Sequence, residues 1–164
     1  MADWLETVYE GHRQGLFTLA LAITGSREDA EDAVHDTFAR LCRLRVNCPA
    51  DPAPYVFAAV RNAARDCLRR VRLPETPGMT IFHLPARAQD DPSRGLAERE
   101  GDRQVQQAIQ SLAQDKRQLV VMKVYGRLTF AQIAAVLGEP LSTISSRYQR
   151  ALDEMRVVLE VQSS

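Results

Sequence analysis

Apolar residues recur every three or four positions along most of this 164-residue chain, a spacing typical of amphipathic α-helices. From Trp4 to Thr24 the apolar positions share one helix face, and Gly25 follows, as is common at a helix end. Runs of β-branched residues are scarce, whereas the helix formers Ala, Leu, Arg, Glu and Gln are abundant. The sequence therefore predicts an all-α fold.

The predicted helices fall into two groups. Ser26 is a natural N-cap for a second helix, and a third helix is predicted from Tyr55 to Leu73 after a proline-rich loop over 47–54. The stretch 73–95 holds four prolines and two glycines and has no helical period. We therefore expect two small helical domains, residues 1–73 and 101–164, joined by a flexible linker over 74–100.

The C-terminal group contains "LTFAQIAAVLGEPLSTISSRYQRAL", two short amphipathic segments that meet at a Gly-Glu-Pro turn. Thr129 is placed to cap the first segment, Gly138 permits the turn, and Ser142 is placed to cap the second. Ile144, Tyr148, Ala151, Leu152 and Met155 form the apolar stripe of the second helix. This pattern predicts a helix-turn-helix, with a simple αα-hairpin as the alternative.

The opposite face of that second helix carries hydroxyl, amide and guanidinium groups, which bond base edges and phosphates. Its members are Thr143, Ser145, Ser146, Arg147, Gln149 and Arg150. No acidic residue interrupts the stretch from Leu141 to Leu152. The absence of acids favours DNA reading, with the helix N-terminus entering the major groove.

The 21 basic and 21 acidic residues cancel, but they are sorted along the chain. Residues 1–36 hold eight acids and two bases, whereas residues 37–73 hold eight bases and two acids. Because salt screens charges beyond about 8–10 Å, the field of one local face decides whether a polyanion binds. Neutrality overall therefore does not exclude nucleic acid.

One predicted helix of the N-terminal group is strongly basic. Arg61, Arg65, Arg69 and Arg72 follow one another at helical spacing, with Arg70 nearby and Asp66 as the single acid. Such a stripe suits a phosphate backbone. By contrast "REDAEDAVHD", residues 27–36, is an acidic patch that would repel DNA and that favours a basic protein partner.

Other classes of protein find little support. The three cysteines and three histidines have no ligand-like spacing, so no metal or other cofactor is expected. No acid, base and nucleophile constellation indicates an enzyme. The acidic, amphipathic start "MADWLETVYEGH" is no signal peptide, and no apolar run reaches the roughly 20 residues that a membrane span needs. We expect a cytoplasmic, non-enzymatic protein without membrane insertion.

Three segments together resemble a known family: "TGSREDAEDAVHDTFARL", "APYVFAAVRNAARDCLRR" and "LTFAQIAAVLGEPLSTISSRYQRALDEMR". They are similar to regions two and four of bacterial sigma factors, in the extracytoplasmic-function (ECF) group of the sigma-70 family. The resemblance covers nearly the whole chain except the linker. It implies a factor that binds the β′ and β subunits of core RNA polymerase, directs it to promoter DNA and helps to open the duplex.

The resemblance also implies roles for individual residues. Core polymerase would be bound by Asp29, Glu31, Asp32, Asp36 and Phe38. The −10 element would be bound by the loop 47–54, which captures a flipped base, and by Asn47, Tyr55, Arg61, Asn62, Arg65 and Arg69. The −35 element would be read by Ser142, Thr143, Ser145, Ser146, Arg147, Gln149 and Arg150. The family often has Trp at Tyr55, and Gly and Lys at Ser142 and Ser145, so its −35 sequence preference does not carry over.

Two non-enzymatic alternatives remain at this point. A sigma-like decoy would bind an anti-sigma factor without engaging promoters, and a stand-alone helix-turn-helix repressor would act as a dimer on duplex DNA. The intact arginine stripe argues against the decoy, and the acidic patch has no purpose in a repressor. An anti-sigma factor is the expected regulator.

Overall fold

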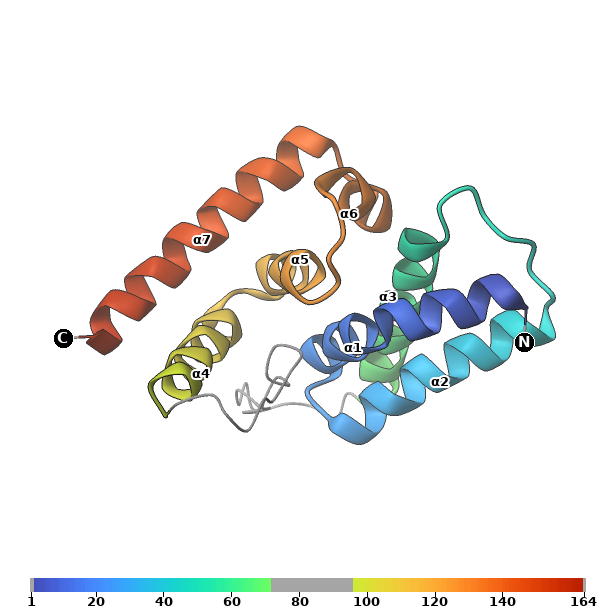
Figure 1. Cartoon of the computed structure of the whole chain (residues 1–164), viewed down its shortest axis with the longest axis horizontal. Helices are drawn as coiled ribbons and strands as arrows, with labels where there is room; N and C mark the ends of the chain where they lie inside the picture. The colour runs from blue at the N-terminus through green and yellow to red at the C-terminus, as the bar shows by residue number, and fades with distance from the viewer. Residues whose placement is uncertain (1, 72–95, 164) are drawn as a thin grey trace.

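The computed structural model describes residues 2–71 and 96–163, and all regular secondary structure in these ranges is α-helical, which confirms the predicted fold class (Figure 1). Seven helices are described: α1 Asp3–Thr24, α2 Arg27–Arg43, α3 Pro52–Val71, α4 Leu96–Ser111, α5 Gln114–Val124, α6 Phe130–Leu137 and α7 Leu141–Ser163. Most of the expected linker, residues 74–95, lies outside the described residues, and residues 96–100 begin α4.

The junction between α1 and α2 is built as the sequence predicts. Gly25 adopts the left-handed conformation with φ 69°, and its amide donates to the Leu21 carbonyl. The Ser26 hydroxyl accepts a hydrogen bond from the Asp29 amide at 3.3 Å and caps α2. The chain therefore reverses within two residues, and α3 packs against both helices.

Helix α3 begins at Pro52, three residues before the predicted start, so the predicted loop 47–54 ends at Asp51. Proline is tolerated in the first turn because its missing amide has no helical partner there and its φ already suits the helix. Pro52 and Pro54 therefore begin this helix rather than prevent it, and the boundary expected from composition was wrong.

The helix-turn-helix is formed by α6 and α7. Thr129 and Gln132 make a reciprocal capping box at the start of α6, and Gly138 ends it with φ 67°. The Ile144 amide donates to the Pro140 carbonyl at 3.1 Å, so α7 already begins at Leu141. Ser142 consequently lies in the first turn, and its predicted capping role was wrong.

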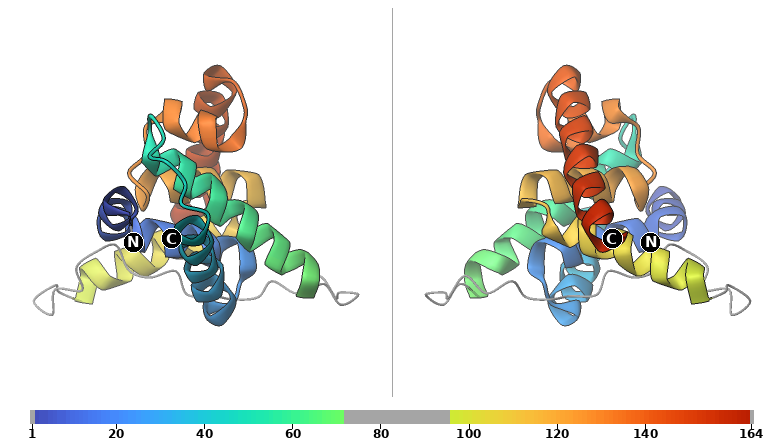
Figure 2. Two further views of the ribbon diagram at one scale, coloured as in Figure 1. Left: turned by 90° about the vertical axis from the view of Figure 1, so that its right-hand side faces the viewer. Right: turned by 90° about the vertical axis from the view of Figure 1, so that its left-hand side faces the viewer.

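The two helical groups share one hydrophobic core, which the sequence did not predict. Helix α1 packs on α5, and α3 packs on α6 (Figure 2). The approach is so close that a Cβ atom added at Gly15 of α1 would lie 2.7 Å from the Cα atom of Gly126. The Phe57 ring of α3 is fully buried, and a Cβ atom added at Gly126 would lie 3.1 Å from it. The described helices thus form a single packed body.

Candidate nucleic-acid and protein interfaces

Helix α7 divides cleanly into a buried and an exposed face. Ile144, Ala151 and Met155 are buried against the C-terminal helices. The predicted DNA-reading residues on the other side include five that are exposed: Ser142, Thr143, Ser146, Gln149 and Arg150. Ser145 is half-buried. The structure therefore brings most of the predicted −35 residues together on one accessible surface.

Arg147 differs from the rest of that predicted set. Its side chain is only 19% exposed and lies between two carboxylates. Its Nη1 atom is 2.6 Å from Glu139 in the turn between α6 and α7, and its Nε atom is 3.6 Å from Asp115 on α5. The Arg147 guanidinium is therefore engaged in two ion pairs within the chain.

On α3 the predicted −10 residues vary in accessibility. Asn62 and Arg69 are exposed, with Arg69 3.6 Å from Asp66, and Arg65 is half-buried. Tyr55 is 41% exposed, and its ring meets the edge of Trp4 with the ring centroids 6.4 Å apart. Asn47, in the loop before α3, is also exposed.

Arg61 is the member of this set that the C-terminal helices hold. Its Nε atom donates a 2.6 Å hydrogen bond to Oε1 of Gln118, which is buried on α5. Burial lowers the pKa of Arg61, the neighbouring Arg65 lowers it further, and Glu139 opposes both effects. An arginine stays charged in proteins, so the desolvated guanidinium needs the Gln118 carbonyl.

A second contact joins the same two regions. The Gln132 amide on α6 donates to both carboxylate oxygens of Asp51, at 3.1 and 3.4 Å. The pocket between this loop and α6 has a volume of about 570 Å³, and its lining includes Tyr55 and Thr129. The loop expected to capture a flipped base therefore faces α6 in this conformation (Figure 2).

The predicted polymerase-binding residues lie on two sides of α2. Asp32 and Asp36 are exposed and Asp29 is half-buried. These three carboxylates add to burial in raising the pKa of the Cys67 thiol on α3, which Arg70 partly offsets. They therefore form an acidic stripe on the side of α2 that faces α3.

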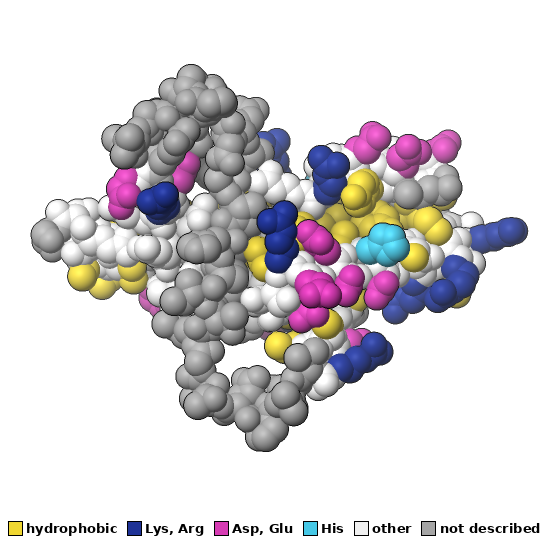
Figure 3. All heavy atoms as spheres, turned by 90° about the horizontal axis from the view of Figure 1, so that it is seen from below, with side chains coloured by type: hydrophobic (Ala, Val, Ile, Leu, Met, Phe, Trp, Pro, Cys, Tyr) yellow, Lys and Arg dark blue, Asp and Glu magenta, His cyan; other side chains and the backbone are white. Residues whose placement is uncertain are grey.

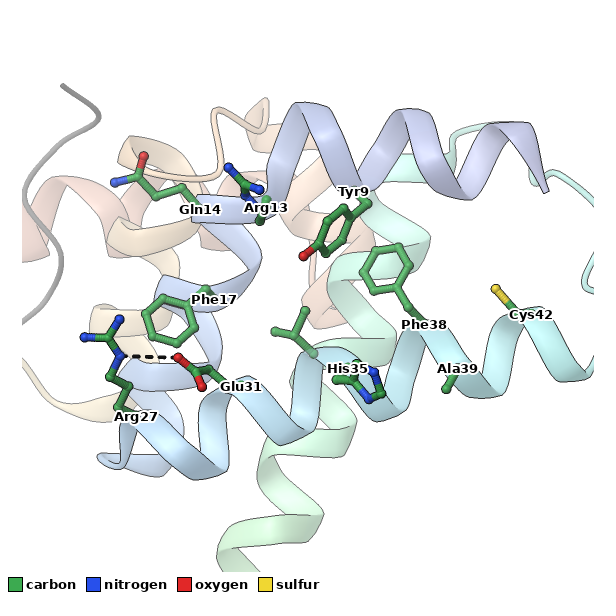
Figure 4. Close-up of a pocket in the computed structure, with 11 residues that line it drawn as sticks. Tyr9, Arg13, Gln14, Phe17, Arg27, Glu31, His35, Phe38, Ala39 and Cys42 are labelled. Atoms are coloured by element: carbon green, nitrogen blue, oxygen red, sulfur yellow. Dashed lines mark hydrogen bonds and ion pairs between the residues drawn. The ribbon is translucent and has the colours of Figure 1, made fainter. Parts of the chain in front are cut away.

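Glu31 and Phe38 instead line a groove of about 810 Å³ between α1 and α2. Tyr9, Phe17 and Phe38 point into it, and Arg27 pairs with Glu31 at 3.3 Å at one end (Figure 4). The space-filling view shows an apolar surface with acidic side chains gathered beside it (Figure 3).

The α1 side of this groove was not predicted as a site from the sequence. It includes Arg13 and Phe17, together with Tyr9, which was predicted only as part of the apolar face of the first helix. Tyr9, Arg13 and Phe17 stand four residues apart on one helix face, beside the stripe that faces the core. That second aromatic stripe was the available signal, because a helix that packs on one side only does not need it.

No cluster of three potential metal ligands occurs among the residues that the structure describes. None of the helices in this part of the chain combines the length and apolar character that a membrane span requires.

Comparison with known families matches both helical groups. The family described as sigma-70 region 2 matches residues 8–73, and the family described as sigma-70, region 4 matches residues 102–155. In two solved structures the fold is similar at 19% identity over 96% of this chain. CnrH in complex with the cytosolic domain of CnrY has a TM-score of 0.66 with 88% of that chain covered. The sigma factor RpoE in complex with the anti-sigma factor NepR from Bartonella quintana has a TM-score of 0.68 with 94% covered.

Similar sequences carry related names. The ECF RNA polymerase sigma factor SigE of Mycolicibacterium smegmatis is 29% identical over 100% of this chain, which spans 64% of that protein. The ECF RNA polymerase sigma factor RpoE of Cereibacter sphaeroides is 29% identical, with 87% of this chain and 77% of that protein covered. The ECF RNA polymerase sigma factor SigL of Mycobacterium tuberculosis is 27% identical, with 97% and 90% covered. The chain belongs to the sigma-70 family, in its ECF group.

Proposed function

We propose that this chain is a transcription initiation factor that binds core RNA polymerase, directs it to specific promoters and helps to open the DNA. Residues 1–73 serve polymerase binding and the −10 element, and residues 101–164 serve the −35 element. It acts in the cytoplasm, where the polymerase is, and supplies no catalytic group or cofactor of its own.

The observation that carries this proposal is the exposed polar face of α7. Thr143, Ser146 and Gln149 are exposed on one side, while Ile144 and Ala151 on the other side are buried. A helix positioned in this way presents hydrogen-bonding groups to base edges, and its acid-free surface does not repel phosphates. We assign −35 recognition to this face.

The −10 element is assigned to Asn47, Tyr55, Asn62 and the arginines of α3. A base taken out of the stack costs a few kcal/mol, which stacking on an aromatic ring and a pocket for the base offset. Because Arg61 is bonded to Gln118 and Asp51 to Gln132, this surface is partly covered. Promoter engagement therefore requires α5 and α6 to move away from α3.

We assign the binding of core polymerase to α2 and the adjoining groove. The exposed Asp32 and Asp36 attract a basic surface, while the apolar groove beside Phe38 supplies area to bury. A specific protein interface usually has an apolar centre and a polar rim, so one partner that straddles α2 would contact both the groove and the acidic stripe. Two of the structurally similar proteins are bound to other proteins, CnrY and NepR, and we propose an anti-sigma factor as a regulator of this chain as well.

Run-off transcription with purified core polymerase tests the proposal. Promoter-specific transcript that depends on this protein is expected. Core binding without transcript would favour the anti-sigma decoy. Repression of a competing holoenzyme through duplex binding alone would favour the repressor.

Two variants separate the assigned surfaces. Asp32→Lys should lower core affinity, whereas Arg150→Ala should leave core affinity unchanged and weaken promoter binding. Arg156→Ala is the matched control for Arg150, because it removes another exposed arginine of the same helix outside the assigned face. If both test variants behave as the wild type, the assignments are wrong.

A further inference from the structure

Two ion pairs of opposite polarity connect the first turn of α5 to the recognition helix α7. Asp115 lies 3.6 Å from Arg147, and the next residue, Lys116, pairs with Glu154, about two turns further along α7. If α7 slid along α5 until Glu154 reached Asp115, two acids would meet. The alternation therefore favours one register of α7 on α5.

Arg147 also reaches a third element. Its Nη1 atom lies 2.6 Å from Oε2 of Glu139, in the turn that joins α6 to α7. That oxygen is buried and has no regular hydrogen bond within the described residues, so the contact is an ion pair. Arg147 thus holds α5, the turn and α7 together at the point where the recognition helix begins.

We infer that Arg147 is a positioning residue, which fixes the angle of α7 through Glu139 and Asp115 instead of contacting DNA itself. The inference rests on the proposed role of α7 in reading the −35 element. Ser142, Thr143 and Ser146 occupy the first turns of α7 and are exposed. Their reach to base edges depends on how that end of the helix is held.

Electrostatics favours this role over direct reading. An Arg147 side chain that turned toward DNA would break its 2.6 Å ion pair with the buried Glu139 oxygen, and removing one partner of a buried pair is costly. Arg150, one turn later, is exposed, and the ion pair of Glu139 is with Arg147. Of the two arginines on the recognition helix, Arg147 therefore fixes the position of the helix and Arg150 faces the phosphates.

Glu139→Gln separates the two possibilities, since it keeps the size of the side chain and removes only its charge. If Arg147 positions the helix, promoter affinity of the holoenzyme should fall about threefold to tenfold. If Arg147 contacts DNA, the same change removes a competing carboxylate, and affinity should stay equal or rise, which would overturn the inference. Asp153→Asn, an exposed acid on α7, is the matched control and should have no effect.

The salt dependence gives a second readout that a loss of fold would not mimic. Arg147→Ala should weaken promoter binding without changing the slope of log affinity against log salt. Arg150→Ala should reduce that slope by about one, as expected for one lost phosphate contact. A reduced slope for Arg147→Ala would contradict the positioning role.

Amide hydrogen exchange tests the inference without any DNA. Glu139→Gln and Arg147→Ala should both speed exchange in the first two turns of α7, whereas Arg150→Ala should not. Unchanged exchange in both variants would overturn the positioning role even if transcription proceeds normally. If the wild-type chain instead directs no transcript, the proposed function fails, and the exchange measurement still decides what Arg147 does.

Discussion

Helices α3 and α7 both carry the arginine and polar side chains that we propose bind DNA, but the folded chain presents them differently. On α7 the exposed residues Ser146, Gln149 and Arg150 face away from the core. On α3 the side chain of Arg61 is bonded to Gln118 of the other helical group, which desolvates it. A polar helix face is therefore accessible to a ligand only where no other part of the chain packs on it or bonds to it.

Under the proposed function, this difference orders the steps of promoter binding. The surface of α7 is accessible in the conformation described, whereas the surface of α3 becomes fully accessible only after α5 and α6 withdraw. Since α1 packs on α5 as well, the separation must break an apolar contact along with the Arg61–Gln118 and Asp51–Gln132 hydrogen bonds and the longer contact of Gln114 with the Ile23 carbonyl. Each of the following changes alters one side of this comparison.

The largest effect is expected from Gly15→Ala. The new methyl group would lie 2.7 Å from the Gly126 Cα atom and 2.9 Å from the Tyr125 carbonyl oxygen, and neither backbone atom moves easily. Such overpacking costs about 1–3 kcal/mol. Urea unfolding followed by Trp4 fluorescence should show lower stability, and small-angle scattering should show a larger radius of gyration.

Gly11→Ala is the matched control, one turn earlier on the same helix. A Cβ atom there meets no atom within 4 Å, so only the helix propensity changes. Stability should rise by about 0.5–1 kcal/mol with an unchanged radius. Equal behaviour of the two alanine variants would mean that the Gly15–Gly126 approach does not hold the two helical groups together.

An intermediate effect is expected from Gln118→Ala. This change removes the acceptor for Arg61, and because that guanidinium is only half-buried the hydrogen bond contributes about 0.5–1.5 kcal/mol. The free energy of unfolding should fall by that amount, while binding to a single-stranded −10 oligonucleotide should become tighter. Gln114→Ala, which removes only a 3.5 Å bond to the Ile23 carbonyl, should change neither quantity. Weaker oligonucleotide binding by Gln118→Ala would contradict the covered state of α3.

The smallest effect concerns the other side of α3. Burial and then Asp29 and Asp32 raise the pKa of Cys67, so less thiolate is present near neutral pH and alkylation is slow. Asp32→Asn should move the pH profile of Cys67 alkylation, followed by mass spectrometry, to lower pH. Asp3→Asn, on α1, should leave it in place. An unmoved profile for Asp32→Asn would show that the acidic stripe does not reach α3.

Local chemistry decided which parts of the fold were predictable. The ends at Gly25 and Gly138 and the caps at Ser26 and Thr129 depend on neighbouring residues, and all four were predicted. The start of α3 at Pro52 was missed because composition alone treats prolines as loop residues, although the first turn accepts them. The cap expected at Ser142 was wrong because the Pro140 carbonyl already starts α7.

Contacts between distant segments were not predictable in the same way. Arg61 and Gln118 are 57 residues apart, and no periodicity links them. The spacing of the arginines on α3 predicted a basic stripe, but it did not show that one member is shared with α5. Likewise, the acid-free face of α7 placed Arg147 among the readers, and only the geometry shows the two carboxylates beside it.

In the proposed function, α3 must be released from α5 and α6 before the chain can bind a promoter. The most direct test uses a chain in which the three native cysteines are replaced and the substitutions Asp51→Cys and Gln132→Cys are introduced. A short, reducible, bifunctional thiol cross-linker then bridges the two positions, and chains with only one of the two substitutions are the controls. The bridged protein should direct no promoter-specific transcript by core polymerase, and reduction should restore it. Equal transcription by the bridged and reduced proteins would show that α3 need not be released.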